Sequence, residues 1–163
     1  MTNFTVHYES PLGGMTMASN GVALTALRFE GTRSESYFAV DTFATMRLPV
    51  FDETRRWLDL YFAGKKPDFT PSLAPQGTPF QQWVWEILLT IPYGKTMSYG
   101  DVARRFSSKM SAQAIGGAVG RNPIGIIIPC HRVIGADGSL TGYGGGLDRK
   151  RWLLELEGLC LFS

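Results

Sequence analysis

The sequence predicts an α/β (α+β) protein in two parts, a small antiparallel β-sheet with a helix followed by a helical part that contains a helix-turn-helix. The first ~45 residues show β-rich, partly alternating patterns. Residues 65–76 are rich in Pro and polar residues, which favours a linker. The remaining residues carry repeated helix start and stop signals. We therefore expect two domains, residues 1–76 and 77–163.

The first domain is expected to contain three strands and one helix. The three β-rich segments begin at Phe4, Gly14 and Val22. Gly- and Asn-containing turns separate them. A helix should run from Asp52, as its N-cap, to about Gly64. Its apolar face is formed by Trp57, Leu58, Tyr61 and Phe62.

The second domain opens and closes with helices. Thr78 and Gln81 form a capping box with Pro at the first helical position, and this helix should end before Pro92. Asp148 can cap the last helix, which Gly158 ends.

Between these helices lies a helix-turn-helix pattern. Ser98 can cap a short helix over 99–106, and Ser111 can cap another over 112–119. Between residues 95 and 132 a single acid, Asp101, faces six basic residues: Lys95, Arg104, Arg105, Lys109, Arg121 and Arg132. A basic surface is the footprint expected for a polyanion such as DNA, although a solvated helix face would give the same pattern.

Residues 126–133, Ile-Ile-Ile-Pro-Cys-His-Arg-Val, are the most informative segment. The apolar run predicts a buried strand over 124–128 that carries Cys130 at its tip. A thiol is a useful nucleophile only as the thiolate, and a neighbouring imidazole or cation lowers its pKa. Neighbours in an extended chain point to opposite faces, so we expect a water to bridge Cys130 and His131 if the chain stays extended.

His131 also needs an orienting partner on its far side, as in any triad. Glu157 lies in the last turn of a helix, where the macrodipole disfavours an anion. Glu155 shares that placement, so the residues alone leave the choice open. The Gly-rich loop over 135–146 lacks the strand–GxGxxG–helix order of a nucleotide site and fits a substrate-lining loop better.

Composition excludes other classes of site. The chain is 44% hydrophobic and 18% charged, which is typical of a globular protein. No apolar run approaches the ~20 residues of a membrane span, and no secretory leader is visible, so we expect a cytoplasmic protein with no membrane partner. Two Cys and two His lie too scattered for a convincing metal site. We expect neither a metal nor a cofactor.

Four motifs in order resemble the O6-alkylguanine-DNA alkyltransferase family. They are Asn-Pro at 122–123, Ile-Pro-Cys-His-Arg-Val at 128–133, Gly-Tyr-Gly-Gly-Gly at 142–146 and Trp-Leu-Leu-Glu-Leu-Glu-Gly at 152–158. The match covers roughly residues 78–158, and the first half is similar only in layout. The resemblance implies a ribonuclease H-like first domain and a winged-helix-like second domain.

The resemblance also implies an activity. Such a protein binds double-stranded DNA in the minor groove through its helix-turn-helix and flips O6-alkylguanine out of the stack. It then transfers the alkyl group, once and irreversibly, to a cysteine. O4 of thymine is a second candidate position. Flipping costs a few kcal/mol, least for a mispaired base. We expect the protein to act as a monomer.

Residue roles follow from the same resemblance. Cys130 is the acceptor, His131 the base acting through water, and Glu157 its orienting carboxylate. Asn122 holds the turn after the recognition helix, and Tyr99 contacts the flipped nucleotide's phosphate and aids protonation of the leaving guanine. The base-reading pocket is expected to contain Val133, Ser139 and Tyr143. The DNA contacts are expected from Ser111, Gln113, Ala114, Arg121 and Arg132.

One residue departs from the family pattern, and two alternative functions remain. The family often carries an arginine where this chain has Gln113, which is shorter and uncharged, so we expect weaker duplex binding or slower flipping. The first alternative is a module that only binds alkylated DNA, but such proteins lack the acceptor cysteine. The second is a cysteine hydrolase using Cys130, His131 and Glu157, for which no oxyanion donor beyond backbone amides can be named.

Overall fold

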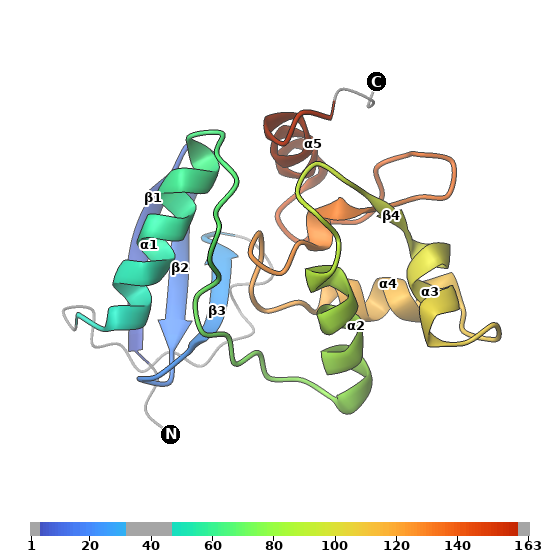
Figure 1. Cartoon of the computed structure of the whole chain (residues 1–163), viewed down its shortest axis with the longest axis horizontal. Coiled ribbons are helices and arrows are strands. Elements are labelled where there is room, and N and C mark those ends of the chain that lie inside the picture. The colour runs from blue at the N-terminus through green and yellow to red at the C-terminus, as the bar shows by residue number, and fades with distance from the viewer. Residues whose placement is uncertain (1–3, 32–46, 160–163) are drawn as a thin grey trace. The chain divides into compact units, whose positions relative to one another are not determined.

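The structure is a computed structural model that describes residues 4–31 and 47–159. Its first element is a three-stranded antiparallel sheet (Figure 1). The strands are β1 (Phe4–Ser10), β2 (Gly13–Ser19) and β3 (Leu24–Phe29), in the order β1-β2-β3. Their register places Val6 opposite Met17 and Met17 opposite Leu27. Because side chains alternate along a strand, these apolar residues share one face, and all three are buried.

Helix α1 (Pro49–Phe62) packs on this sheet, where the Tyr8 hydroxyl donates a hydrogen bond to Asp59 Oδ1 at 2.6 Å. The expected start at Asp52 is wrong, because the helix begins three residues earlier with Leu48 as N-cap. Proline at the first helical position presets the backbone for a helix, so Pro49 is a stronger start signal than Asp52. Asp52 lies instead in the first turn, where the helix macrodipole favours an anion.

The Pro-rich stretch after α1 is tied to the sheet. Leu24 N donates to Ser72 O at 2.8 Å, and Ala74 N donates to Leu24 O at 2.8 Å. Leu73 therefore forms an isolated parallel bridge with Leu24. By its internal packing the chain divides into two compact units, residues 1–76 and 77–163.

The second unit is mainly helical. Its helices are α2 (Pro79–Leu89), α3 (Tyr99–Phe106), α4 (Ala112–Gly120) and α5 (Leu147–Leu156). The expected capping box of Thr78 and Gln81 is confirmed, and Ser98 and Ser111 cap α3 and α4 as expected. Asp148 is not the cap of α5, because Gly146, with φ 97°, ends the preceding loop and takes the N-cap position. The α+β class is confirmed.

Two contacts join the helices of the second unit. The indole N–H of Trp85, in α2, donates to the carbonyl of Ala118, in α4, at 3.0 Å. A Cβ added at Gly116 would lie 3.9 Å from the Tyr99 ring, so this glycine faces α3 at ordinary contact distance. Trp85 is therefore a packing residue, as its place in an apolar helix face suggests.

The apolar run 124–128 forms a compact turn, and the expected strand is wrong. Ile126 has φ 68°, in the left-handed region that a β-branched residue rarely adopts. Asn122 closes the turn: its Oδ1 accepts from Ile124 N at 3.0 Å and its Nδ2 donates to Ile128 O at 2.8 Å. A side-chain amide thus supplies hydrogen bonds that a neighbouring strand would otherwise make. The short strand β5 (Val133–Ile134) follows later and pairs in parallel with β4 (Met97–Ser98).

Candidate active site

Cys130 is the first residue of a short 3₁₀-helix, η2 (Cys130–Arg132), and not the tip of a strand. Only 9% of Cys130 is exposed. Successive residues of a 3₁₀-helix point about a third of a turn apart. Cys130, His131 and Arg132 therefore face three different directions, and the alternation argument for a bridging water does not apply to this backbone.

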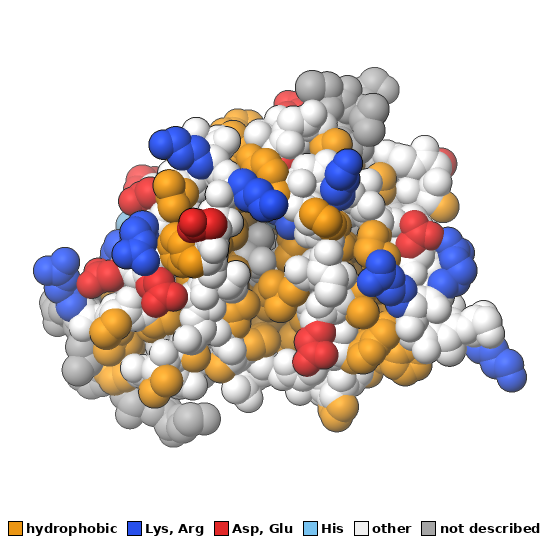
Figure 2. Space-filling model, in the orientation of Figure 1, with side chains coloured by type: hydrophobic (Ala, Val, Ile, Leu, Met, Phe, Trp, Pro, Cys, Tyr) orange, Lys and Arg blue, Asp and Glu red, His pale blue; other side chains and the backbone are white. Residues whose placement is uncertain are grey.

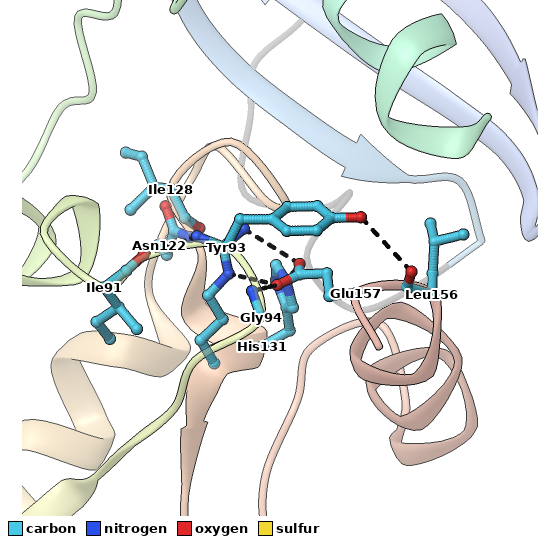
Figure 3. A network of polar contacts seen from close by, with 9 residues as sticks. Ile91, Tyr93, Gly94, Asn122, Ile128, His131, Leu156 and Glu157 are labelled. Carbon is cyan, nitrogen blue, oxygen red and sulfur yellow. Dashed lines mark hydrogen bonds and ion pairs between the residues drawn. The ribbon is translucent and has the colours of Figure 1, made fainter. Parts of the chain in front are cut away.

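A buried carboxylate holds His131. Glu157, the C-cap of α5, has its Oε2 2.6 Å from His131 Nε2, and both side chains are fully buried. Figure 3 shows the Glu157 carboxylate between His131 and the backbone of Gly94, whose N–H donates to Oε1 at 2.9 Å. Glu155 is exposed. Of the two candidate carboxylates, the structure therefore brings Glu157 to His131.

The protonation states of this pair follow from its surroundings. Burial alone would raise the pKa of Glu157, but the hydrogen bonds and charges of His131 and Arg132 outweigh burial and hold it at about 2. Burial, together with the charges of Arg132 and Lys150, lowers the pKa of His131 by more than Glu157 raises it. At neutral pH an ionised carboxylate thus faces a neutral imidazole. An ionised carboxylate can only accept, so Nε2 carries the ring proton and Nδ1 is the basic nitrogen.

Arg132 lies behind this pair. Its Nε donates to Glu157 Oε1 at 2.8 Å, and its Nη1 donates to the carbonyl of Ile91 at 2.8 Å. The guanidinium also lies 5.8 Å from the centre of the Tyr93 ring. Its side chain is only 10% exposed. These contacts argue against the expected role of Arg132 in binding DNA and favour a role in holding Glu157 ionised.

Two tyrosines lie near the thiol. Tyr99, the first residue of α3, and Tyr143, in the Gly-rich loop, both interact electrostatically with Cys130. Burial raises the pKa of each phenol, so both hydroxyls keep their protons at neutral pH. The Tyr99 hydroxyl donates to the carbonyl of Thr141 at 2.9 Å, which joins α3 to the loop.

The other expected pocket residues differ in position. Val133 is fully buried in β5, where it pairs with Met97. Ser139 is exposed, and its hydroxyl donates to Asp137 Oδ1 at 2.6 Å within the loop. In this structure the Ser139 hydroxyl is thus engaged by its own loop.

The expected DNA-contacting residues of α4 are exposed. They are Ser111, Gln113, Ala114 and, at the C-cap, Arg121. A Cβ added at Gly117 or Gly120 would meet nothing within 4 Å, so packing does not require glycine at either position. Figure 2 shows Lys and Arg side chains dispersed over the visible face among Asp and Glu, without one continuous basic patch.

Lys150 is the buried ionisable residue that the sequence analysis missed. It is completely buried, and its ammonium donates to the carbonyls of Thr141 at 2.8 Å and Gly142 at 3.2 Å. A sequence signal exists, because Lys150 precedes the buried Leu153 and Leu154 by three and four residues and so shares their helix face.

In the part of the chain that the structure describes, no group of three or more His, Cys, Asp or Glu is arranged to hold a metal ion. No helix among the described residues is long and apolar enough to cross a membrane.

Comparison with known proteins gives matches along the whole described chain. The ribonuclease-like domain of 6-O-methylguanine DNA methyltransferase matches residues 5–75, and the DNA binding domain of the same family matches residues 79–159. A methylated-DNA–protein-cysteine methyltransferase of Mycobacterium tuberculosis (strain ATCC 25618 / H37Rv) is 49% identical, over 93% of this chain and 92% of that protein. One from Methanosarcina acetivorans is 44% identical, over 94% and 97%.

Solved structures of the same family are similar to this chain. The crystal structure of Mycobacterium tuberculosis OGT in complex with DNA has a TM-score of 0.82 at 48% identity, covering 94% of this chain and 92% of that chain. The O6-methylguanine-DNA methyltransferase of Pyrococcus kodakaraensis, 22% identical with a TM-score of 0.57, shares the fold.

Proposed function

The chain belongs to the 6-O-methylguanine DNA methyltransferase family, and from this premise we propose that Cys130 is its alkyl acceptor. The protein is a methylated-DNA–protein-cysteine methyltransferase, which repairs alkylated DNA by transferring the alkyl group from the base to its own cysteine. The observation that supports Cys130 is its position next to His131, whose imidazole is buried and bonded to the ionised Glu157.

The transfer is a single displacement. His131 takes the thiol proton of Cys130, through a water or directly, and the thiolate sulfur attacks the alkyl carbon on O6 of guanine. The sulfur–carbon bond forms as the carbon–O6 bond breaks, and the electron pair leaves with guanine. The Glu157 carboxylate stabilises the imidazolium that His131 becomes. No step regenerates the thiol, so each molecule acts once.

The leaving guanine must gain one proton, which balances the proton that the thiol lost. Tyr99 is the candidate donor, because its raised pKa keeps the hydroxyl protonated and because it lies close enough to Cys130 to interact with it electrostatically. The hydrogen bond from Tyr99 to Thr141 holds the hydroxyl in place before DNA arrives.

The helix-turn-helix of α3 and α4 is the proposed DNA-binding element. The exposed residues of α4 and the open space over Gly117 and Gly120 would let a sugar–phosphate backbone approach closely, as in a minor groove. We expect the protein to act as a monomer. We place this activity in the cytoplasm, and O4 of thymine remains a second candidate position for the lesion.

The test is intact-mass and peptide analysis after incubation with a duplex that contains O6-methylguanine. We expect one methyl group on Cys130, in an amount equal to the active protein, and none in Cys130→Ala or with an undamaged duplex. Lesion-bound protein with an unmodified thiol would indicate a binding module, and ester turnover without lasting modification of Cys130 would indicate a hydrolase.

A further inference from the structure

The buried side chain of Lys150 ends beneath the Gly-rich loop over 135–146. Lys150 lies on α5, and none of its surface is exposed. Its ammonium donates to the carbonyl oxygen of Thr141 at 2.8 Å and to that of Gly142 at 3.2 Å. Removing an ammonium from water is unfavourable unless new partners compensate, and an apolar side chain would fill the same space without that cost. The ammonium is therefore expected to do more than fill space.

The carbonyl of Thr141 is shared by two donors. The hydroxyl of Tyr99, at the start of α3, donates to the same oxygen at 2.9 Å. A carbonyl oxygen has two lone pairs, so it can accept both hydrogen bonds at once. Because both donors bind one oxygen, the Lys150 ammonium nitrogen and the Tyr99 hydroxyl oxygen lie within two hydrogen-bond lengths of each other. Lys150 thus helps to fix the acceptor that orients the Tyr99 hydroxyl.

The ring of Tyr99 is held by the same ammonium. Nζ of Lys150 lies 5.8 Å from the centre of the ring, within the distance of about 6 Å at which a cation is attracted to an aromatic face. A Cβ added at Gly142 would lie 3.7 Å from the hydroxyl oxygen, and one added at Gly116 would lie 3.9 Å from the ring. Tyr99 therefore contacts both the loop and α4, and Lys150 contacts both its ring and its hydrogen-bond acceptor.

We propose that Lys150 is a positioning residue for Tyr99, the candidate donor of the proton that the leaving guanine gains. Its ammonium holds the ring of Tyr99 and the Thr141 carbonyl before DNA arrives. When the hydroxyl turns from this carbonyl to the base, Lys150 keeps the carbonyl bonded. Tyr99 then gives one proton to guanine and regains one from water after the transfer. This inference deepens the proposed function and rests on Tyr99 being the proton donor.

The test is a double-mutant cycle on single-turnover methyl transfer from an O6-methylguanine duplex. Lys150→Met removes the ammonium, and Tyr99→Phe removes the hydroxyl but keeps the ring. Lys150→Met alone should lower the rate by about 10- to 100-fold, because a misplacement of about 1 Å can cost 10²-fold, while duplex affinity stays near that of the wild type. In the Tyr99→Phe background the same change should cost little more, because Lys150 acts through the hydroxyl. Equal fold losses in the two backgrounds would overturn the proposal.

The matched control is Arg149→Met. Arg149 precedes Lys150 on α5 and holds the same loop at another point, where its Nη1 donates to the carbonyl of Gly145 at 3.0 Å. Any loss of rate in Arg149→Met should be the same with and without the Tyr99 hydroxyl. If the effect of Arg149→Met also vanished in the Tyr99→Phe background, a loosened loop would explain both results and the proposal would be wrong.

A measurement without DNA decides if Lys150→Met does not fold, and it also stands apart from any failure of the wild type to methylate Cys130. Burial lowers the pKa of Lys150 to about 8, so its charge can be removed by raising the pH. In wild-type protein whose Cys130 is blocked with methyl methanethiosulfonate, NMR follows the Cε signal of Lys150 and the Cζ signal of Tyr99 from neutral to alkaline pH. A Tyr99 signal that moves with the midpoint of Lys150 supports the proposal, and one that does not follow Lys150 overturns it.

The other ionisable groups of the site do not interfere with this titration. Their pKa values lie above the range for Tyr143 and below it for His131 and Glu157. Guanidinium groups, as in Arg132 and Arg149, stay charged throughout. With Cys130 blocked, a change at Tyr99 that follows Lys150 thus reports the loss of the ammonium charge.

Discussion

At the scale of single residues, Glu157 shows how a buried carboxylate can stay ionised. Its two oxygens accept hydrogen bonds from the Gly94 amide, the Arg132 guanidinium and the His131 ring. Protonation of the carboxylate would turn one of its acceptor sites into an O–H donor that faces these donors. Arg132 and Gly94 therefore maintain the ionised state of Glu157 that His131 requires in its proposed role as a base.

Replacing Glu157 by glutamine removes the negative charge of the side chain and keeps its shape, so it should show the effect of the charge alone. In Glu157→Gln the amide NH₂ must face a donor from Arg132 or Gly94, and the imidazolium of His131 loses its stabilising anion. We expect the single-turnover repair rate to fall by about 10²- to 10⁴-fold, the usual contribution of a general base. The measurement is methyl transfer from an O6-methylguanine duplex by quenched flow. Glu155→Gln is the matched control, since Glu155 is exposed; equal rates for the two variants would contradict the assigned role.

The sequence motif identifies Cys130 and His131, but it does not reveal what surrounds them. Arg132 follows His131 directly and looks like one more surface cation, and Lys150 stands among other basic residues. The burial of Arg132 depends on contacts with Ile91 and Glu157, 41 and 25 residues away, and that of Lys150 on contacts with the loop at Thr141. Such roles arise from tertiary packing, which a single sequence does not specify.

At the scale of elements, the sequence predicts a helix start correctly where the interactions that define this start are local. The capping boxes at Thr78 and Ser98 join residues three apart, so the sequence predicts these helix starts correctly. The run 124–128 has the apolar, β-branched composition of a strand, yet only Ile124 forms an isolated bridge, and residues 125–128 lie in a turn and bend. The Asn122 side chain holds it as a turn instead.

Helix α4 contains Gln113, the residue that we expect to affect base flipping. Gln113 is exposed in its first turn and is shorter than the arginine often found there in the family. Gln113→Arg should add a cation that can fill the gap left by the flipped base, and should raise duplex affinity and repair rate several-fold. Both are measured on an O6-methylguanine duplex, with Gln113→Lys as the control that adds charge without the planar group. Unchanged affinity and rate in Gln113→Arg would refute the idea that Gln113 limits flipping.

At the scale of the whole molecule, charge is divided unevenly. Residues from 80 onward carry nine Lys and Arg against six Asp and Glu, whereas the residues before carry seven against eight. The excess is small, and basic side chains are dispersed over the face in Figure 2. DNA affinity should therefore depend on a few individual phosphate contacts.

Arg121, exposed at the end of α4, is a suitable residue for testing this dependence. Arg121→Gln should weaken binding to all sequences and reduce the slope of log affinity against log salt by about one, the value for one lost phosphate contact. Fluorescence anisotropy with a labelled duplex over a salt series gives both quantities. Lys66→Gln, an equal loss of charge in the other unit, should leave the slope unchanged; an equal decrease in both variants would show a general effect of net charge.

The bond from Gly94 to Glu157 joins residues 63 apart in the sequence, and the stretch between them contains most of the second unit. Contacts of such high sequence separation form late, because the intervening chain must be ordered first. Cys130 therefore gains its proposed base, His131, only in molecules that have completed folding. Stoichiometric uptake of a labelled alkyl group would count the native molecules in a preparation, a quantity that total protein concentration does not report.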